Sequence, residues 1–113
     1  MKLFFSFKGK PGRPVGPIQF SDISINIVPL SWHPPTKDGG KPVTNYIVEV
    51  KKSKCSTWSK CGDVSAVKTI FIAEKLLEGQ NYFFRVSAVN EKGPGAPLES
   101  LTSVRLEKPI GKF

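Results

Sequence analysis

The sequence predicts an all-β fold in which seven short antiparallel strands form two stacked sheets, a β-sandwich. Three features carry this prediction: an indole on a strand of period two (Leu30-Ser31-Trp32), a phenol at the start of another strand (Tyr82), and a glycine–proline run before the last strand (residues 93–97). No segment shows the apolar period of an amphipathic helix. Short strands separated by turn residues are typical of a sandwich whose core lies between its sheets.

The length and composition of the chain suit a single domain. Its 113 residues are 39% hydrophobic and 23% charged, and eight Phe, two Trp and two Tyr supply bulky side chains for one core. Residues 11–107 are assigned to this domain, residues 1–10 to a tail or preceding linker, and residues 108–113 to a trailing linker. No stretch approaches the roughly 18 consecutive apolar residues of a membrane helix, so no membrane partner is expected.

The first strands follow a stiff lead-in. Gly9 to Pro17 contains three prolines and three glycines, so it is predicted to run into an edge strand at most. Ile18 to Ile23 alternates loosely and is predicted as the first strand. Ile27 to His33 is the next, with apolar residues on one face at period two. Pro29 lies inside this second strand, where a missing N–H donor is unexpected.

The remaining strands are predicted from the same alternation. Val43 to Lys51 is the clearest, and Trp58 is expected on a short flanking strand that packs across the sheet edge. Lys68 to Ala73 is apolar on both faces. Tyr82 to Asn90 keeps its large residues in phase, and Leu98 to Leu106 is predicted as the final strand.

The net charge of +8 raises the question of a nucleic-acid partner. Only Lys51, Lys52, Lys54 and Lys60 form a cluster inside the domain, and the other basic residues are dispersed. Nucleic-acid binders usually combine such charge with aromatic stacking platforms or a groove-reading helix, and the sequence shows neither. A solvated basic face is therefore predicted, with no nucleic-acid partner.

Two cysteines leave the redox state open. Cys55 and Cys61 would close a short loop if the chain is secreted, and two free thiols are equally natural in a cytosolic protein. No Asn-x-Ser/Thr sequon is present, which weakens an extracellular interpretation. His33 is the only histidine, so no metal site and no cofactor are expected.

Longer motifs resemble those of fibronectin type III domains over about residues 11–107, most closely the domains of titin, twitchin and myosin-binding protein C. The motifs are Leu30-Ser31-Trp32-His33-Pro34-Pro35, Asp38-Gly39-Gly40, Tyr46-Ile47-Val48-Glu49-Val50-Lys51, Tyr82-Phe83-Phe84-Arg85-Val86-Ser87-Ala88-Val89-Asn90 and Gly93-Pro94-Gly95-Ala96-Pro97-Leu98-Glu99-Ser100. The resemblance implies an immunoglobulin-like sandwich with a three-strand sheet packed on a four-strand sheet. It also implies a tyrosine corner, in which the Tyr82 hydroxyl bonds backbone near Leu76 to Gly79.

The alternation separates core residues from outward ones. The expected structural core is Leu30, Trp32, Tyr46, Val48, Leu76, Tyr82, Phe84 and Val86. Apolar residues out of phase should point outward and, with the glycine–proline loop, form a mixed apolar and basic partner surface. Its candidate residues are Ile47, Lys51, Phe83, Val89, Gly93 and Gly95.

These features exclude a catalyst and favour a binding module, because no nucleophile–base pair or metal set is present. The resemblance implies a structural and protein-interaction module of a tandem-domain muscle protein, cytoplasmic and sarcomeric. Its partners would be neighbouring immunoglobulin or type III domains, or myosin and other thick-filament proteins, and the isolated domain would be monomeric. The alternative is an extracellular adhesion or receptor module of the same fold.

Overall fold

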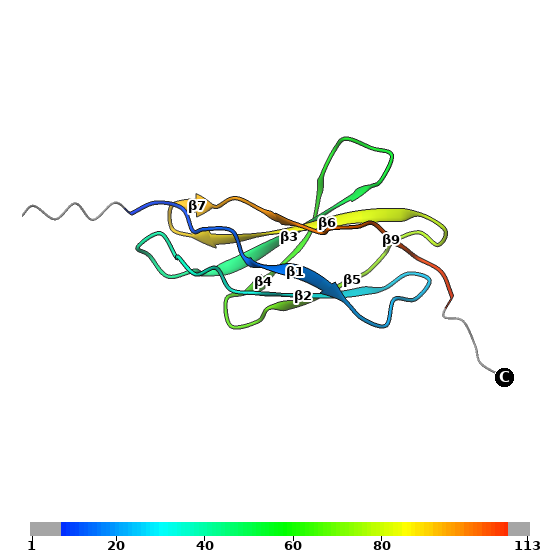
Figure 1. Ribbon diagram of the computed structural model, residues 1–113, viewed down its shortest axis with the longest axis horizontal. Coiled ribbons are helices and arrows are strands. Elements are labelled where there is room, and N and C mark those ends of the chain that lie inside the picture. The colour runs from blue at the N-terminus through cyan, green and yellow to red at the C-terminus, as the bar shows by residue number, and fades with distance from the viewer. Residues whose placement is uncertain (1–7, 109–113) are drawn as a thin grey trace, which may run out of the picture.

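Two antiparallel sheets pack face to face in the structure, a computed structural model that describes residues 8–108 (Figure 1). The smaller sheet has the order β1–β2–β5, and the larger has the order β4–β3–β6 followed by three short segments that pair with β6. The strands of the smaller sheet are β1 (Val15–Phe20), β2 (Val28–His33) and β5 (Ile70–Ala73). Those of the larger sheet are β3 (Asn45–Lys52), β4 (Ser59–Ser65), β6 (Asn81–Asn90), β7 (Gly93–Pro94), β8 (Leu98–Glu99) and β9 (Val104–Arg105).

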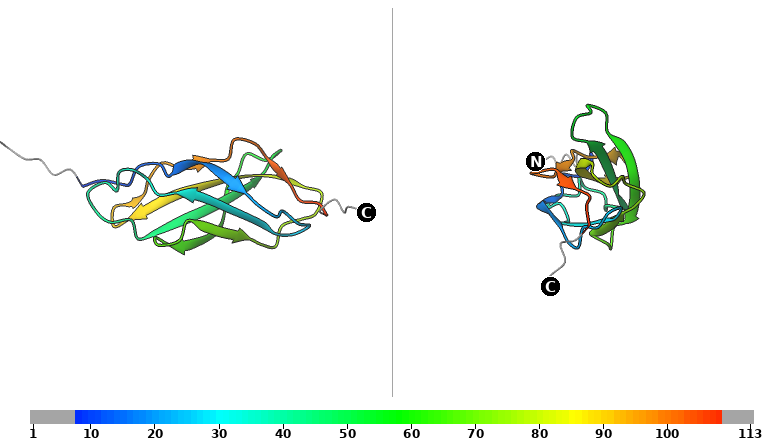
Figure 2. Two further views of the ribbon diagram at one scale, coloured as in Figure 1. Left: turned by 60° about the horizontal axis from the view of Figure 1, so that its bottom comes forward. Right: turned by 90° about the vertical axis from the view of Figure 1, so that its right-hand side faces the viewer.

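The described chain enters at one end of the sandwich and leaves at the other. Figure 2 shows the blue lead-in and the red final segment at opposite ends of the long axis. The predicted all-β sandwich with a three-strand and a four-strand layer is confirmed, because β7, β8 and β9 follow one another along the same edge of β6. Parts of the predicted tail and trailing linker, residues 1–7 and 109–113, lie outside the described residues.

The last strand is broken rather than continuous from Leu98 to Leu106 as predicted. At Ser100 the backbone N–H donates to the carbonyl of Phe84 (2.8 Å), and the Ser100 hydroxyl accepts from the N–H of Phe84 (3.1 Å). The hydroxyl thus replaces a backbone acceptor, and the next residue, Leu101, turns outward to 81% exposure. Pairing with β6 resumes at Val104.

Pro29 is compatible with its place in the middle strand of the smaller sheet. The N–H of Ser21 donates to the Pro29 carbonyl (3.2 Å), so the backbone polar groups of Pro29 face the β1 side. Ser21 comes directly after the last residue of β1, Phe20, so the missing proline donor faces a point where regular β1 pairing has ended. Because residues of a ladder alternate their bonding side, the contact of Pro29 with Ile72 in β5 needs no proline N–H.

The core lies between the sheets and contains the expected residues. Leu30, Val48, Phe84 and Val86 are at most 1% exposed, and Leu76 is partly buried against them. Trp32 is 2% exposed and meets the Tyr46 ring edge-on, with 5.3 Å between ring centroids and 66° between planes. Burying side chains of this size stabilises the fold by about 1.5–3 kcal/mol each.

The tyrosine corner is present. The backbone N–H of Leu77 donates to the Tyr82 hydroxyl over 3.0 Å, and Tyr82 is 5% exposed. The ring therefore closes the core at the start of β6 while its hydroxyl holds the β5–β6 connection.

Candidate partner-binding surfaces

The outer face of the larger sheet carries four of the predicted partner-contact residues. Along β3, Tyr46 and Val48 point into the core, and the alternate residues, such as Ile47, point outward. Strand β6 alternates in the same way. Ile47, Phe83 and Val89 accordingly lie on the outer face, each half-buried.

Cationic and aromatic side chains alternate beside Phe83. The Lys51 Nζ lies 5.0 Å from the centroid of the Phe83 ring and 5.6 Å from that of Trp58. The guanidinium carbon of Arg85 lies 4.5 Å from the Trp58 centroid. Contacts of this kind contribute about 0.5–1 kcal/mol each at exposed sites. Lys51, Trp58, Phe83 and Arg85 are called the cation–π ladder below.

An ion pair fixes one end of this ladder. The Arg85 Nε donates to Glu49 Oε1 over 2.8 Å, and Arg85 Nη2 donates to Glu49 Oε2 over 3.4 Å. The two side chains are 26% and 24% exposed, so the pair is partly shielded from water and holds the guanidinium plane on Trp58. The Lys51 Nζ instead donates to the carbonyl of Cys55 over 3.0 Å.

Trp58 lies elsewhere than the sequence predicts. It precedes β4, and its ring packs on the outer face of β3 and β6 rather than across the sheet edge. The register explains this position: Val50 pairs with Ser59, so Lys51 is brought opposite Trp58. The alternation pattern alone does not contain this information, because it depends on the turn that joins β3 to β4.

The glycine–proline loop is packed against the lead-in. The N–H of Gly95 donates to the Ala88 carbonyl (2.9 Å), and a Cβ at Gly95 would overlap the carbonyl oxygen of Pro11. Gly93 has a φ of +115°, a conformation that L side chains rarely adopt. The close approach at Gly95 and the positive φ at Gly93 each require glycine, apart from any partner contact. Both glycines are half-buried.

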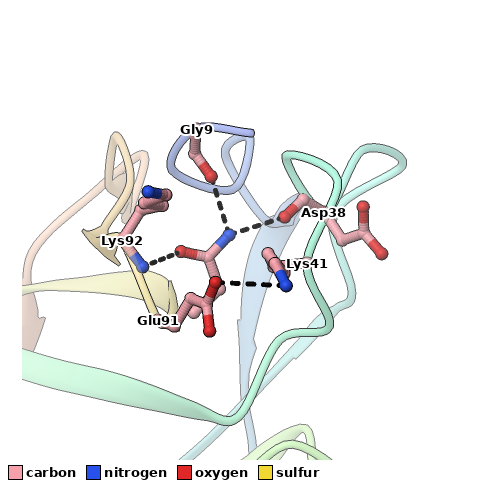
Figure 3. A network of polar contacts seen from close by, with 6 residues as sticks. Gly9, Asp38, Lys41, Glu91 and Lys92 are labelled. Carbon is pink, nitrogen blue, oxygen red and sulfur yellow. Dashed lines mark hydrogen bonds and ion pairs between the residues drawn. The ribbon is translucent and has the colours of Figure 1, made fainter. Parts of the chain in front are cut away.

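Asn90 joins three segments at the entry end of the domain (Figure 3). Its Nδ2 donates to the carbonyls of Gly9 and Asp38, each over 2.8 Å, and its Oδ1 accepts from the N–H of Lys92 over 2.8 Å. Asn90 is 3% exposed, and the Gly9 N–H also donates to the Gly39 carbonyl (2.8 Å). Gly9, which the sequence places in the tail, thus contacts the domain.

Two titratable groups among the described residues have a pKa that differs clearly from its ordinary value. Burial raises the pKa of the Cys61 thiol and of the Tyr46 phenol above their ordinary values. Cys55 and Cys61 are both free.

Residues 8–108 hold no cluster of three or more His, Cys, Asp or Glu side chains suited to a metal ion. Within the same residues, no helix is long and apolar enough to cross a bilayer.

Comparison with known proteins identifies the family. The sequence profile of the fibronectin type III domain matches residues 13–104. This chain belongs to the fibronectin type III family. A titin homolog of Caenorhabditis elegans is 45% identical over 92 residues, which is 81% of this chain. The human fast-type myosin-binding protein C is 37% identical over 84 residues, 74% of this chain.

Solved structures agree with this assignment. A crystal structure of titin domains shares 32% identity and a TM-score of 0.81, covering 88% of this chain and 33% of that one. The twitchin kinase region of Caenorhabditis elegans shares 33% identity and a TM-score of 0.82, covering 92% of this chain and 18% of that one. The chain spans 0% and 7% of the two curated relatives above, so it matches a stretch of single-domain length in each of these much longer proteins. A structural or protein-binding role follows for the type III domain.

Proposed function

We propose that this chain is a non-catalytic module of a tandem-domain, titin-like muscle protein, located in the cytoplasm at the sarcomere. In that setting it maintains filament spacing, contributes elasticity, and contacts neighbouring domains or myosin. The observation that carries the proposal is the similarity to titin and myosin-binding protein C, joined to a geometry in which the chain enters and leaves at opposite ends (Figure 1). That geometry suits a string of domains with both outer sheet faces free for contact.

The outer face of β3 and β6 is the proposed partner surface. Ile47, Lys51, Phe83 and Val89 lie on it, while Gly93 and Gly95 shape the loop beside it. The cation–π ladder supports the proposal because it holds long side chains in fixed positions before a partner arrives. A preorganised face loses less side-chain entropy on binding than a flexible one.

Cosedimentation with purified myosin filaments tests this function. The double variant Ile47→Ser/Phe83→Ser should weaken binding by about tenfold or more, because two apolar contacts are lost from the proposed face. The matched control is Ile70→Ser/Ile72→Ser, which changes outward residues that are 51% and 53% exposed on the opposite sheet. Equal binding of the original chain, the double variant and the control would contradict the assignment of this face. Failure of the original chain to bind filaments would contradict the myosin contact itself.

A further inference from the structure

The connection between β3 and β4 is a basic hairpin that protrudes from the sandwich (Figure 1, green loop at the top). From Lys51 to Lys60 the chain carries four lysines and no Asp or Glu. The end-on view in Figure 2 shows the same projection, well away from both layers. Lys52, Lys54 and Lys60 are exposed, so most of the charge of this hairpin faces solvent.

Two neighbouring hollows lie at the base of the hairpin. One, of about 370 Å³, is lined by Lys52, Ser53, Lys54, Cys55, Gly79, Gln80, Asn81 and Arg105. The other, of about 360 Å³, is lined by Val50, Lys51, Lys52, Cys55, Thr57, Ser59 and Tyr82. Lys52 and Cys55 line both hollows, so the two adjoin at the hairpin base; together they are called the hairpin groove below. Its lining contains four cationic side chains and no carboxylate.

Backbone hydrogen bonds hold the hairpin groove in shape. The N–H of Ser53 donates to the carbonyl of Asn81 (2.9 Å), which ties the hairpin to the start of β6. The N–H of Cys55 donates to the carbonyl of Lys52 (2.9 Å), and this closes the turn. A groove that is already ordered loses little conformational freedom when a ligand enters.

The cations of the groove are largely uncompensated. Among residues 8–108, Lys51, Lys52 and Lys54 take part in no ion pair within 4.0 Å. Arg105 lies 3.6 Å from Glu107, but both side chains are more than half exposed, and exposed pairs of this length contribute little. The groove therefore offers unneutralised positive charge at a defined site.

We propose that the hairpin groove binds an acidic, extended segment of a partner protein. The inference deepens the proposed function and rests on it, because it names the chemistry of one partner contact. Carboxylates of the segment would pair with Lys52, Lys54 and Arg105, and backbone amides would meet the hydroxyl and amide groups of the lining. Val50, which is half-buried, offers apolar contact in the second hollow.

Other anionic ligands suit the groove less well. Single-stranded nucleic acid needs free aromatic faces for stacking, whereas Lys51 and Arg85 are both stacked on Trp58 and Lys51 also lies over Phe83. A membrane surface favours apolar side chains that insert, and no large exposed hydrophobic residue lies on the hairpin. A single phosphate ion would fill only a small part of two adjoining hollows of this size.

Fluorescence anisotropy of a labelled oligoglutamate peptide with the 113-residue chain tests the proposal. The Lys52→Glu/Lys54→Glu variant should weaken binding by about tenfold or more, and binding to the original chain should fall as salt is added. The matched control is Lys8→Glu/Lys68→Glu, which makes the same change of net charge at exposed sites away from the groove. An oligoglutamine peptide of equal length should not bind.

Each other outcome overturns the inference. Equal weakening by the control variant means that net charge, not the groove, attracts the peptide. Stronger binding of a single-stranded oligonucleotide or of phosphatidylserine vesicles assigns the groove to nucleic acid or membrane, and full competition by millimolar inorganic phosphate assigns it to a small anion. Absence of oligoglutamate binding removes the acidic segment as a ligand. If oligoglutamate does not bind while the 113-residue chain still binds myosin filaments, the groove proposal fails and the proposed function stands.

Discussion

Asn90 connects three segments at the entry end of the domain. It is the last residue of β6, and its amide reaches a carbonyl of the lead-in and a carbonyl of the β2–β3 connection. A buried carbonyl that loses its donor is destabilised, since water cannot easily replace the bond. One side chain thereby makes the position of Gly9 depend on that of Asp38.

The variant Asn90→Ala should lower the free energy of unfolding by about 1–3 kcal/mol, because the Gly9 and Asp38 carbonyls lose a donor in a partly buried site. Urea denaturation followed by tryptophan fluorescence measures the change. Asn26→Ala is the control, since Asn26 is exposed and should change stability by less than about 0.5 kcal/mol. Equal stability of the two variants would show that the Asn90 bonds exchange freely with water.

At the scale of elements, the β3–β4 hairpin contains a register irregularity. Val48 pairs with Gly62 and Glu49 with Lys60, so Cys61 is an extra residue in β4. Such a bulge bends an edge strand and disturbs its unpaired backbone groups, which discourages pairing with another chain. Cys61 also packs against the core, whereas Cys55 is exposed in the connection.

This difference predicts unequal thiol reactivity. In the folded chain, iodoacetamide at about pH 8 should alkylate exposed Cys55 quickly and Cys61 slowly, because burial raises the Cys61 pKa and lowers its thiolate fraction. Mass spectrometry after timed quenching measures both rates, and in urea the Cys61 rate should rise to that of an exposed thiol. Absence of labelling at both residues until a reductant is added would instead indicate the bridge of a secreted protein.

The same shift sets the sign of a pH effect on stability. Because the folded state holds the Cys61 proton more tightly, the free energy of unfolding should fall as pH rises from the pKa of the unfolded thiol to the raised folded value. Cys61→Ala should reduce this fall, which urea denaturation at a series of pH values measures.

The sequence predicts the strands better than the connections between them and their register. Trp32 and Tyr82 stand on strands with a strong period of two, and the core positions follow from that alternation alone. The break at Ser100 was missed because a side-chain hydroxyl there replaces a backbone acceptor, which no alternation pattern records. Trp58 was misplaced because its neighbours depend on hairpin register. The hairpin groove likewise combines residues from three separate segments, so only the structure could reveal it.

At the scale of the whole molecule, the lead-in decides where the folded unit begins. The family profile starts at residue 13, and the sequence placed the boundary at residue 11. In the structure, however, the N–H of Gly9 donates to Gly39 and the N–H of Gly12 donates to the Lys37 carbonyl (2.9 Å). A Cβ at Gly39 would also overlap the Gly9 carbonyl oxygen, so the two segments lie in close contact.

A chain that starts at Arg13 should therefore have a lower free energy of unfolding than one that starts at Lys8, by about 1–3 kcal/mol. This figure allows for the conformational entropy that folding no longer has to spend on ordering residues 8–12. Thermal and urea unfolding of the two truncations measure this difference. The decisive comparison adds Asn90→Ala to both. In the Arg13 chain the Gly9 carbonyl is already gone, so Asn90→Ala should cost less there than in the Lys8 chain. Strict additivity would mean that Asn90 and the lead-in act independently, and the folded unit would then begin after the lead-in rather than within it.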